Sequence, residues 1–228
     1  MKNVHDVLEN IHGFSEKVRN GEWTGATGKK LNNLIVIGIG GSYLSIEFVY
    51  ESLRSHPKYK ELAAGRKIKF LANVDPIDFD RAVEGTTFIT SGLDVEETLI
   101  LVNSKTFTTA ETILNAKSCK QWMINQYSKL GVTDVALIAE KHICACSTNL
   151  KATTEFGINI KNVFGFWDFV GGRFSVWSSI GVLPLAIHFG YETACKFLAG
   201  GHSIDGLLLK EKDITVLFLL FRKIFPFC

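Results

Sequence analysis

The chain has 228 residues, of which 46% are hydrophobic and 21% are charged, and its 25 basic and 23 acidic side chains leave a net charge of +2. This composition excludes an intrinsically disordered chain, and without a long basic run it gives no reason to expect a nucleic-acid partner. A chain of this length can bury most of a sizeable apolar core, so a folded domain is expected.

The first segment is predicted to form an amphipathic helix over Met1 to Gly21, because apolar residues recur there at three- and four-residue spacing. Its opening residues mix both charges and lack the apolar run of a secretory signal. No targeting signal is therefore expected, and the predicted location is the cytoplasm.

From about Lys30, short apolar runs alternate with segments of helix length, a pattern typical of helices packed on both faces of a parallel sheet. Strands are predicted at Leu34 to Ile39, Ile68 to Asn73, Thr98 to Val102, Ile143 to Ser147 and Val163 to Phe166. Helices are predicted at Leu44 to Arg54, Ile77 to Val83, Thr109 to Tyr127 and Leu150 to Phe156. The expected fold is a three-layer α/β domain with a doubly wound, five-stranded parallel sheet.

Beyond Trp167 the pattern becomes helical, with segments predicted at Phe174 to Phe189, Tyr191 to Leu198, Ile204 to Leu209 and Asp213 to Lys223. The chain is expected to divide into an opening helix and entry loop (1–30), a sheet-containing domain (31–173) and a helical extension (174–228). The most apolar stretch, Ile214 to Phe227, is too short to span a membrane and is interrupted by two basic residues. It is predicted to be a buried helix, and no membrane partner is expected.

The five cysteines are odd in number and scattered, and no C-x-x-C pair suggests a zinc site. Cys144 and Cys146 lie in an apolar run, so both are predicted to be buried thiols without a chemical role. No cysteine zinc site is expected, and a reducing environment fits this cysteine usage best.

A glycine-rich turn, Gly38-Ile-Gly-Gly-Ser42, follows the first predicted strand and precedes a helix. Glycines there let a ligand approach the backbone, and the helix amides offer donors for an anion. A nicotinamide-binding fold would also have such a turn, but Tyr43 replaces the third fingerprint glycine, and the acid after the next strand, Asp75, comes about thirty-five residues on instead of about twenty. A nicotinamide cofactor is therefore not expected.

A second turn, Ser104-Lys-Thr-Phe-Thr-Thr-Ala-Glu-Thr112, is rich in hydroxyl residues where a strand gives way to a helix. Thr108 and Glu111 have the spacing of a capping box, which predicts a helix start near Thr109. Hydroxyls and first-turn amides at the positive end of a helix make a compact phosphate site, with Lys105 as an added charge. The alternative is that these are ordinary capping and turn residues.

A third segment, Asp168-Phe-Val-Gly-Gly-Arg-Phe-Ser175, places Arg173 directly after a glycine pair at a predicted helix entry. Glycine lets the backbone come close to a ligand, and arginine can offset negative charge that develops on a substrate oxygen. Taken alone, Arg173 could equally be a surface residue beside a turn.

Taken together, three segments in this order and spacing resemble those of the glucose-6-phosphate isomerase family: Ile37-Gly-Ile-Gly-Gly-Ser42, Ser104-Lys-Thr-Phe-Thr-Thr109 and Asp168-Phe-Val-Gly-Gly-Arg-Phe-Ser175. Flanking segments are similar to the same family, closest to its plant cytosolic members: Asn20-Gly-Glu-Trp-Thr-Gly25, Phe70-Leu-Ala-Asn-Val-Asp-Pro76, Ser147-Thr-Asn149 and Phe166-Trp-Asp168. The resemblance runs from near Val7 to about Leu220.

The resemblance implies a sugar-isomerase (SIS) domain over 31–173, a homodimer, and the reversible conversion of glucose 6-phosphate to fructose 6-phosphate in glycolysis and gluconeogenesis, without metal or organic cofactor. It implies that Gly41 and Ser42 contact the sugar phosphate. The substrate-binding turn would comprise Ser104, Lys105, Thr106 and Thr109, which hold the phosphate group, together with Phe107 and Thr108. Gly172 would lie at the reacting end beside Arg173, the one catalytic residue that the resemblance assigns here.

The resemblance assigns the family's glutamate base, ring-opening histidine and late lysine to segments that follow the equivalent of residue 220. The chain is therefore expected to be a partial family member that binds sugar phosphate but lacks the base, and no resemblance to the family is recognised in residues 221–228. His188 and His202 lie in helical segments and are predicted to be packing or surface residues, not replacements. Two alternatives stay open: a non-enzymatic sugar-phosphate-binding SIS module, and a partner subunit for a complete isomerase.

Overall fold

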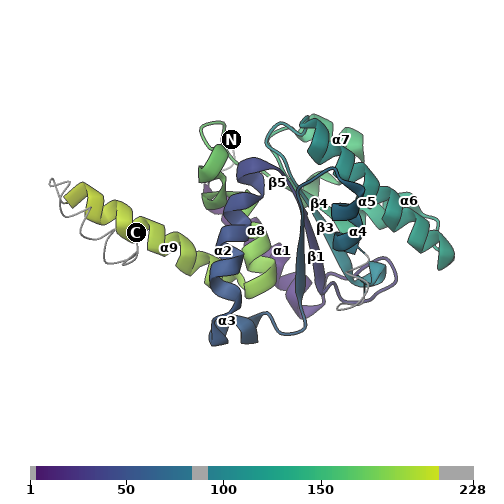
Figure 1. Ribbon diagram of the computed structural model, residues 1–228, viewed down its shortest axis with the longest axis horizontal. Coiled ribbons are helices and arrows are strands. Elements are labelled where there is room, and N and C mark those ends of the chain that lie inside the picture. Colours follow the sequence, from purple (N-terminus) through teal and green to yellow (C-terminus); the bar gives the residue numbers. More distant parts are fainter. Residues whose placement is uncertain (1–3, 84–91, 211–228) are drawn as a thin grey trace.

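The computed structural model describes residues 4–83 and 92–210, which form a parallel sheet of five strands between two layers of helices (Figure 1). The strands are β1 (Asn33–Ile37), β2 (Lys67–Leu71), β3 (Thr98–Asn103), β4 (Ile143–Cys146) and β5 (Val163–Phe164). Their order across the sheet is β2-β1-β3-β4-β5, and every neighbouring pair is parallel. The predicted fold class and all five predicted strands are confirmed.

One face of the sheet is covered by α1 (Val4–Asn20), α2 (Leu44–Arg54) and α8 (Ser179–Phe189), with the short α3 (Pro57–Leu62) beside them. Their apolar side chains form one core with the strand residues that point this way, such as Leu34 and Val36 of β1. All of α8 is buried, because it lies on the sheet and also contacts α1, α2 and the following helix. The predicted opening helix is confirmed as α1.

The opposite face is covered by α4 (Pro76–Val83), α5 (Ala110–Lys129), α6 (Val135–His142) and α7 (Leu150–Phe156). The second core forms on this side, and Ile35 and Ile37 of β1 point into it. Successive side chains of a strand point to opposite faces, so β1, which is buried along its whole length, supplies both cores. Helices on both faces complete the three predicted layers.

Two helices, α3 and α6, were not predicted from the sequence. The helix α3 has six residues and begins at Pro57, too short for a repeating apolar pattern. The helix α6 has only eight residues and runs directly into β4, so it is too short to show a clear helical period. Its start is set by Asp134, whose carboxylate accepts hydrogen bonds from the amides of Ala136 and Leu137 at 3.0 Å.

The carboxyl-terminal helices differ from the prediction in two ways. The predicted helix start at Phe174 is wrong, because a 3₁₀ turn (η4, Gly172–Trp177) comes first and Ser178 caps α8 by accepting from the amide of Ile180. The predicted break after Leu198 is also wrong, because α9 (Tyr191–Lys210) runs without interruption through the glycine pair at positions 200 and 201. A Cβ atom on the second of them, Gly201, would lie 2.7 Å from the ring of Trp177, so this glycine allows close packing.

The predicted segments Asp213 to Lys223 and Ile214 to Phe227 lie outside the described residues. Within 4–83 and 92–210, no helix is long and apolar enough to cross a membrane. The predicted burial of Cys144 and Cys146 is confirmed, since both thiols are fully buried in β4 and burial raises the pKa of Cys146 to about 12. Among the same residues, no group of three or more histidine, cysteine or acidic side chains could hold a metal ion.

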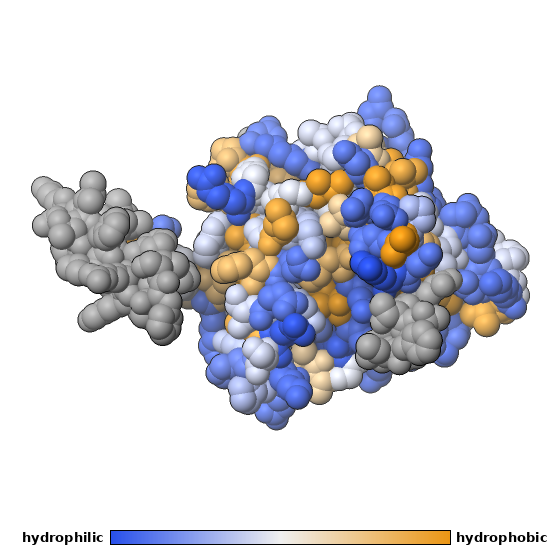
Figure 2. Space-filling model, viewed as in Figure 1, coloured by the Kyte–Doolittle hydropathy of each residue, from blue (hydrophilic) through white to orange (hydrophobic). Residues whose placement is uncertain are grey.

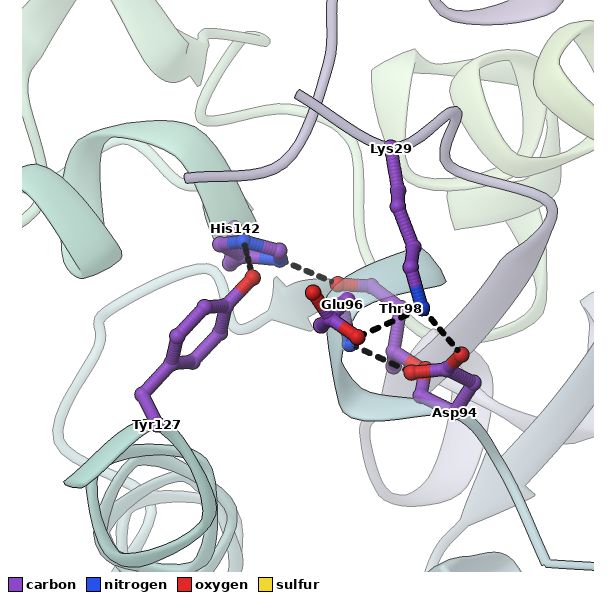
Figure 3. Close-up of polar contacts among 6 residues, drawn as sticks. All are labelled: Lys29, Asp94, Glu96, Thr98, Tyr127 and His142. Carbon is purple, nitrogen blue, oxygen red and sulfur yellow. Dashed lines mark hydrogen bonds and ion pairs between the residues drawn. The ribbon is translucent and has the colours of Figure 1, made fainter. Parts of the chain in front are cut away.

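At the amino-terminal edge of the sheet, the imidazole of His142 joins three parts of the chain (Figure 3). Its Nδ1 atom donates to the carbonyl of Thr98 at 2.7 Å, so Nε2 is the acceptor and faces the amide of Ala26 at 2.9 Å and the hydroxyl of Tyr127 at 2.6 Å. Burial lowers the pKa of His142 to about 4, and a proton on Nε2 would meet two donors. The neutral ring therefore fixes the entry loop to β3 and α5.

Nearby, Lys29 of the same loop contacts both Asp94 and Glu96, at 3.1 and 2.5 Å (Figure 3). These side chains lie at the surface, where an ion pair contributes little to stability because water and salt screen it. The buried histidine contacts, more than this ion pair, hold the entry loop against the sheet.

Candidate sugar-phosphate site

The carboxyl ends of β1 and β3 lie side by side at the point where the strand order reverses. Strand β1 pairs with β2 on one side, and the chain then returns to place β3 on the other side, with Val102 beside Ile37. In open α/β sheets, ligands bind outside the carboxyl ends of the strands at such a point. The two turns singled out in the sequence, residues 38–42 and 104–109, both begin here.

The turn after β1 forms a 3₁₀ turn over Gly40–Ser42 (η1) that leads into α2. Gly40 has a φ angle of +59°, a left-handed conformation that residues with a side chain rarely adopt. The Gly41 carbonyl accepts a hydrogen bond from the hydroxyl of Ser45 at 2.6 Å, and the Ser42 carbonyl accepts one from the side-chain amide (Nδ2) of Asn103 at 3.5 Å. The turn is therefore held by both α2 and the end of β3.

The glycine turn also contacts the third predicted segment. A Cβ atom on Gly41 would lie 1.9 Å from the carbonyl oxygen of Gly172, so these two backbones pack against each other without room for a side chain. Gly172 itself has a left-handed φ angle of +53°. Its neighbour Arg173 is exposed, with its guanidinium carbon 4.7 Å from the centre of the Phe174 ring. The structure thus brings the first and third segments together.

The turn after β3 is shaped by its first residue. Ser104 is buried, and its hydroxyl accepts a hydrogen bond from the amide of Phe107 at 3.1 Å. Phe107 has a φ angle of +54°, which is unusual for a residue with a side chain. Its ring is buried in the second core, edge-on to the ring of Phe156. Only the main chain of Phe107 can therefore face a ligand. Burial of this ring holds the turn in its left-handed conformation.

The start of α5 is where predicted, but the predicted capping box is wrong. The first intrahelical bond runs from the amide of Ile113 to the carbonyl of Thr109, which makes Thr109 the capping position. Its side chain makes no capping hydrogen bond, and the Thr108 hydroxyl instead donates to the Thr106 hydroxyl at 2.7 Å. The main-chain amides of residues 110–112 are the first three of α5. Amides in the first turn of a helix have no hydrogen-bond acceptor within that helix.

Lys105 connects this turn to the third segment. Its ammonium group donates to the main-chain carbonyl of Asp168 and, at 3.0 Å, to that of Val170. The sequence suggested Lys105 as a charge beside a phosphate and gave no sign of these two contacts. With the packing of Gly41 on Gly172, they bring all three predicted segments to one edge of the sheet.

Four residues that support the site received no role from the sequence. Ser147 and Thr148 donate through their hydroxyls to the carbonyl of Lys105 at 3.1 and 2.8 Å. The side-chain amide of Asn149 donates to the carbonyl of Thr106 at 2.9 Å. Asn103, at the end of β3, donates to Ser42 and to the Ile180 carbonyl, while its own buried oxygen has no partner among the described residues. Ser147 to Asn149 could have been found, since that segment resembles the same family.

An apolar groove of about 490 Å³ lies beside the glycine turn. Its lining includes Gly41, Phe48, Arg173, Trp177 and Phe197. Phe48 is 68% exposed. Hydrophobic and hydrophilic residues are interspersed over the face of the molecule shown in Figure 2. The candidate site therefore borders an apolar surface as well as the polar turns.

The two histidines of the carboxyl-terminal helices behave as predicted. His188 is buried in α8 with its ring edge-on to Tyr50, and burial, reinforced by the charges of Arg66 and Arg19, lowers its pKa to about 4. His202 lies exposed on α9. One is a packing residue and the other a surface residue.

The family model for phosphoglucose isomerase matches residues 1–222. The chain belongs to this family. Phosphoglucose isomerases of plants are among its curated relatives: the cytosolic glucose-6-phosphate isomerase of Oenothera sinuata var. hirsuta and the cytosolic 2A form of Clarkia lewisii are each 50% identical over 217 residues. In both cases the matched region covers 94% of this chain and 36% of the relative, so the chain spans about a third of their length.

One solved structure agrees with this phosphoglucose isomerase assignment, and a second shares the fold alone. A crystal structure of a glucose-6-phosphate isomerase from Chlamydia trachomatis superimposes with a TM-score of 0.67 at 26% identity, covering 89% of this chain and 33% of that one. A hypothetical protein from Thermus thermophilus shares the fold, with a TM-score of 0.56 at 22% identity and coverage of 80% and 38%. The segments on which the resemblance was based therefore belong to a family member.

Proposed function

We propose that this chain binds the phosphate group of glucose 6-phosphate and fructose 6-phosphate at the carboxyl ends of β1 and β3. The hydroxyls of Ser104, Thr106 and Thr109 and the first amides of α5 would hold the phosphate, since hydroxyls and helix amino termini are good donors to anions. The rest of the binding surface would come from Gly41, Ser42, Lys105, Phe107 and Thr108.

The observation that carries this proposal is the uncapped start of α5. Thr109 occupies the capping position without a side-chain hydrogen bond, so the amides of residues 110–112 stay available beside a run of hydroxyl residues. Helix α5 has 20 residues, long enough for its dipole to place positive partial charge at this end. Ordinary capping residues would have used these amides, which weakens the interpretation of the turn as purely structural.

The reacting end of the sugar would lie towards Gly172 and Arg173. Moving a proton between C1 and C2 of the open-chain sugar passes through an enediolate, which requires a base and a positive charge near the oxygen. Arg173 would supply the charge, because a guanidinium keeps its proton at neutral pH. We propose no base within the described residues, because the resemblance assigns that glutamate to a later segment of the family.

The wider biology is proposed from the relatives. Several of them are named cytosolic glucose-6-phosphate isomerases, which supports a cytoplasmic location and a place in glycolysis and gluconeogenesis. We extend to this chain the homodimer implied by the resemblance, the SIS-domain assignment of residues 31–173 and operation without metal or cofactor. A chain that binds the substrates without converting them would instead act as a sugar-phosphate-binding module or as a partner subunit.

Isothermal titration with glucose 6-phosphate, fructose 6-phosphate and free glucose tests the proposal. We expect heat from both phosphates and none from glucose at the same concentrations. Replacing Ser104 and Thr106 together by alanine should weaken binding of both phosphates by about 1 to 3 kcal/mol, the usual cost of lost hydrogen bonds to a charged group. Equal heats for glucose and glucose 6-phosphate would remove the phosphate assignment.

A further inference from the structure

Lys105 is held at both ends by different parts of the chain. Its carbonyl oxygen accepts from Ser147 and Thr148, which fixes its backbone to the turn after β4. Its ammonium group donates to the carbonyls of Asp168 and Val170, which lie just before Gly172 in sequence. One residue therefore joins three loops at the carboxyl edge of the sheet.

These contacts use most of the donor capacity of the side chain. An ammonium group has three N–H donors, and two are directed at main-chain carbonyls of the 168–170 segment. The side chain is half-buried along this path. The Lys105 ammonium group thus holds the turn after β3 at a fixed distance from the 168–170 segment. This role differs from that of a free cation beside a phosphate.

The two loops joined by Lys105 are the two ends of the site proposed above. Residues 104–109 would hold the phosphate, and Gly172 and Arg173 would face the carbons that react. The backbone packing of Gly41 on Gly172 fixes the second loop against the glycine turn, and Lys105 fixes it against the hydroxyl-rich turn. The distance between the ends limits which ligand can reach both.

We propose that Lys105 is a positioning residue that determines specificity: by tethering the 168–170 segment it sets the span between the phosphate-holding turn and Arg173, and so favours six-carbon sugar phosphates over shorter phosphate esters. This inference rests on the proposed function. It assigns the lysine side chain to the protein's own loop, and leaves the phosphate to the hydroxyls and amides of the turn.

The test compares three ligands, inorganic phosphate, glycerol 3-phosphate and glucose 6-phosphate, by titration of the full 228-residue chain and its variants. We expect Lys105→Met to weaken glucose 6-phosphate about tenfold, while the affinities for the two smaller ligands change less than about threefold. Lys105→Arg should restore part of the lost preference, because a guanidinium can donate to both carbonyls. Lys151→Met is the matched control, since Lys151 is an exposed lysine on α7 whose ion pair with Glu155 spans 4.0 Å.

Hydrogen exchange of the ligand-free chain gives a second, independent measurement. Lys105→Met should raise exchange of amides in residues 166–174 and leave that of β4 unchanged, and Lys105→Gln serves if the methionine variant does not fold. An equal loss of affinity for all three ligands would make Lys105 a direct phosphate contact and overturn the proposal, as would unchanged exchange in residues 166–174. If the unaltered chain binds none of the three ligands, the proposed function itself is wrong, regardless of the hydrogen-exchange result. The specificity role of Lys105 is then wrong as well.

Discussion

The backbone of Gly41 packs directly on the carbonyl group of Gly172, so closely that a Cβ atom on Gly41 would lie 1.9 Å from that oxygen. The contact joins the turn after β1 to the turn before α8, two segments far apart in the sequence. Gly41 is therefore required by lack of space, whereas a Cβ atom on Gly172 would meet nothing and glycine is favoured there by the left-handed φ angle of +53°.

The substitution Gly41→Ala should separate these two turns. Because the clash is with main-chain atoms that cannot rotate away, we expect a stability loss of about 1 to 3 kcal/mol together with weaker binding of glucose 6-phosphate. Thermal unfolding and titration measure the two effects. Gly171→Ala is the matched control, since its backbone is extended and a Cβ there meets nothing within 4 Å. Equal effects from both variants would contradict the importance of the contact.

Replacing Ser104 by alanine should destabilise the protein even without ligand. The hydroxyl is the acceptor for the Phe107 amide inside the protein, and an unsatisfied buried donor costs about 1 to 3 kcal/mol. Urea unfolding measures the loss. Thr108→Ala removes an exposed hydroxyl that bonds only to Thr106 in the described structure and should change the free energy of unfolding by about 0.5 kcal/mol or less. A Ser104 variant as stable as the original would show that the turn is fixed by Phe107 burial alone.

Stability should fall as the pH drops from about 7 to 5, because two buried histidines resist protonation. The pKa of His142 is lowered to about 4 in the folded chain, against about 6.5 when unfolded, so the unfolded state binds more protons in this window. The effect of His142 grows as pH falls and reaches about 3 kcal/mol only near pH 4. His188, with a pKa also lowered to about 4, adds an effect of the same sign.

Urea midpoints measured between about pH 7.5 and 5 check this dependence. His142→Gln should lower stability at the upper end of this range but flatten the pH dependence, because glutamine keeps one donor and one acceptor and cannot take up the proton. His202→Gln, which changes an exposed histidine, should leave both the midpoint and its slope as they were. If the stability of the His142→Gln variant still depends steeply on pH, then titratable groups other than His142 cause the pH dependence.

We expect the 228-residue chain by itself to bind glucose 6-phosphate without interconverting it. Arg173 could stabilise an enediolate, but the resemblance places the base outside the matched segments, and general acid–base participation is worth about 10² to 10⁴ in rate. A coupled assay with purified chain should stay at background. Enzyme-like turnover would mean that a base within these residues has been missed, and Asp168, in the same segment as Arg173, would be the first residue to replace.

The sequence predicted the sheet because each strand is a compact apolar run with its own boundaries, as in β1 and β3. It could not predict α6, which is short and runs directly into β4, or the uninterrupted α9, where Gly201 serves packing on Trp177 and not a turn. The three site segments were found because glycine and hydroxyl residues stand out locally. The contacts of Lys105 with Asp168 and Val170 could not be predicted, because they depend on how loops that are distant in the sequence meet in the fold.

The buried cysteines provide natural probes of how the protein opens. Cys144 and Cys146 lie in β4 and Cys119 lies in α5, and burial raises the pKa of all three thiols, whereas Cys195 on α9 is half-exposed. Among these four cysteines, a thiol reagent followed by mass spectrometry should therefore modify Cys195 first and reach β4 only when the sheet parts. The order of labelling would time local and global unfolding in the natural sequence, with no engineered probe.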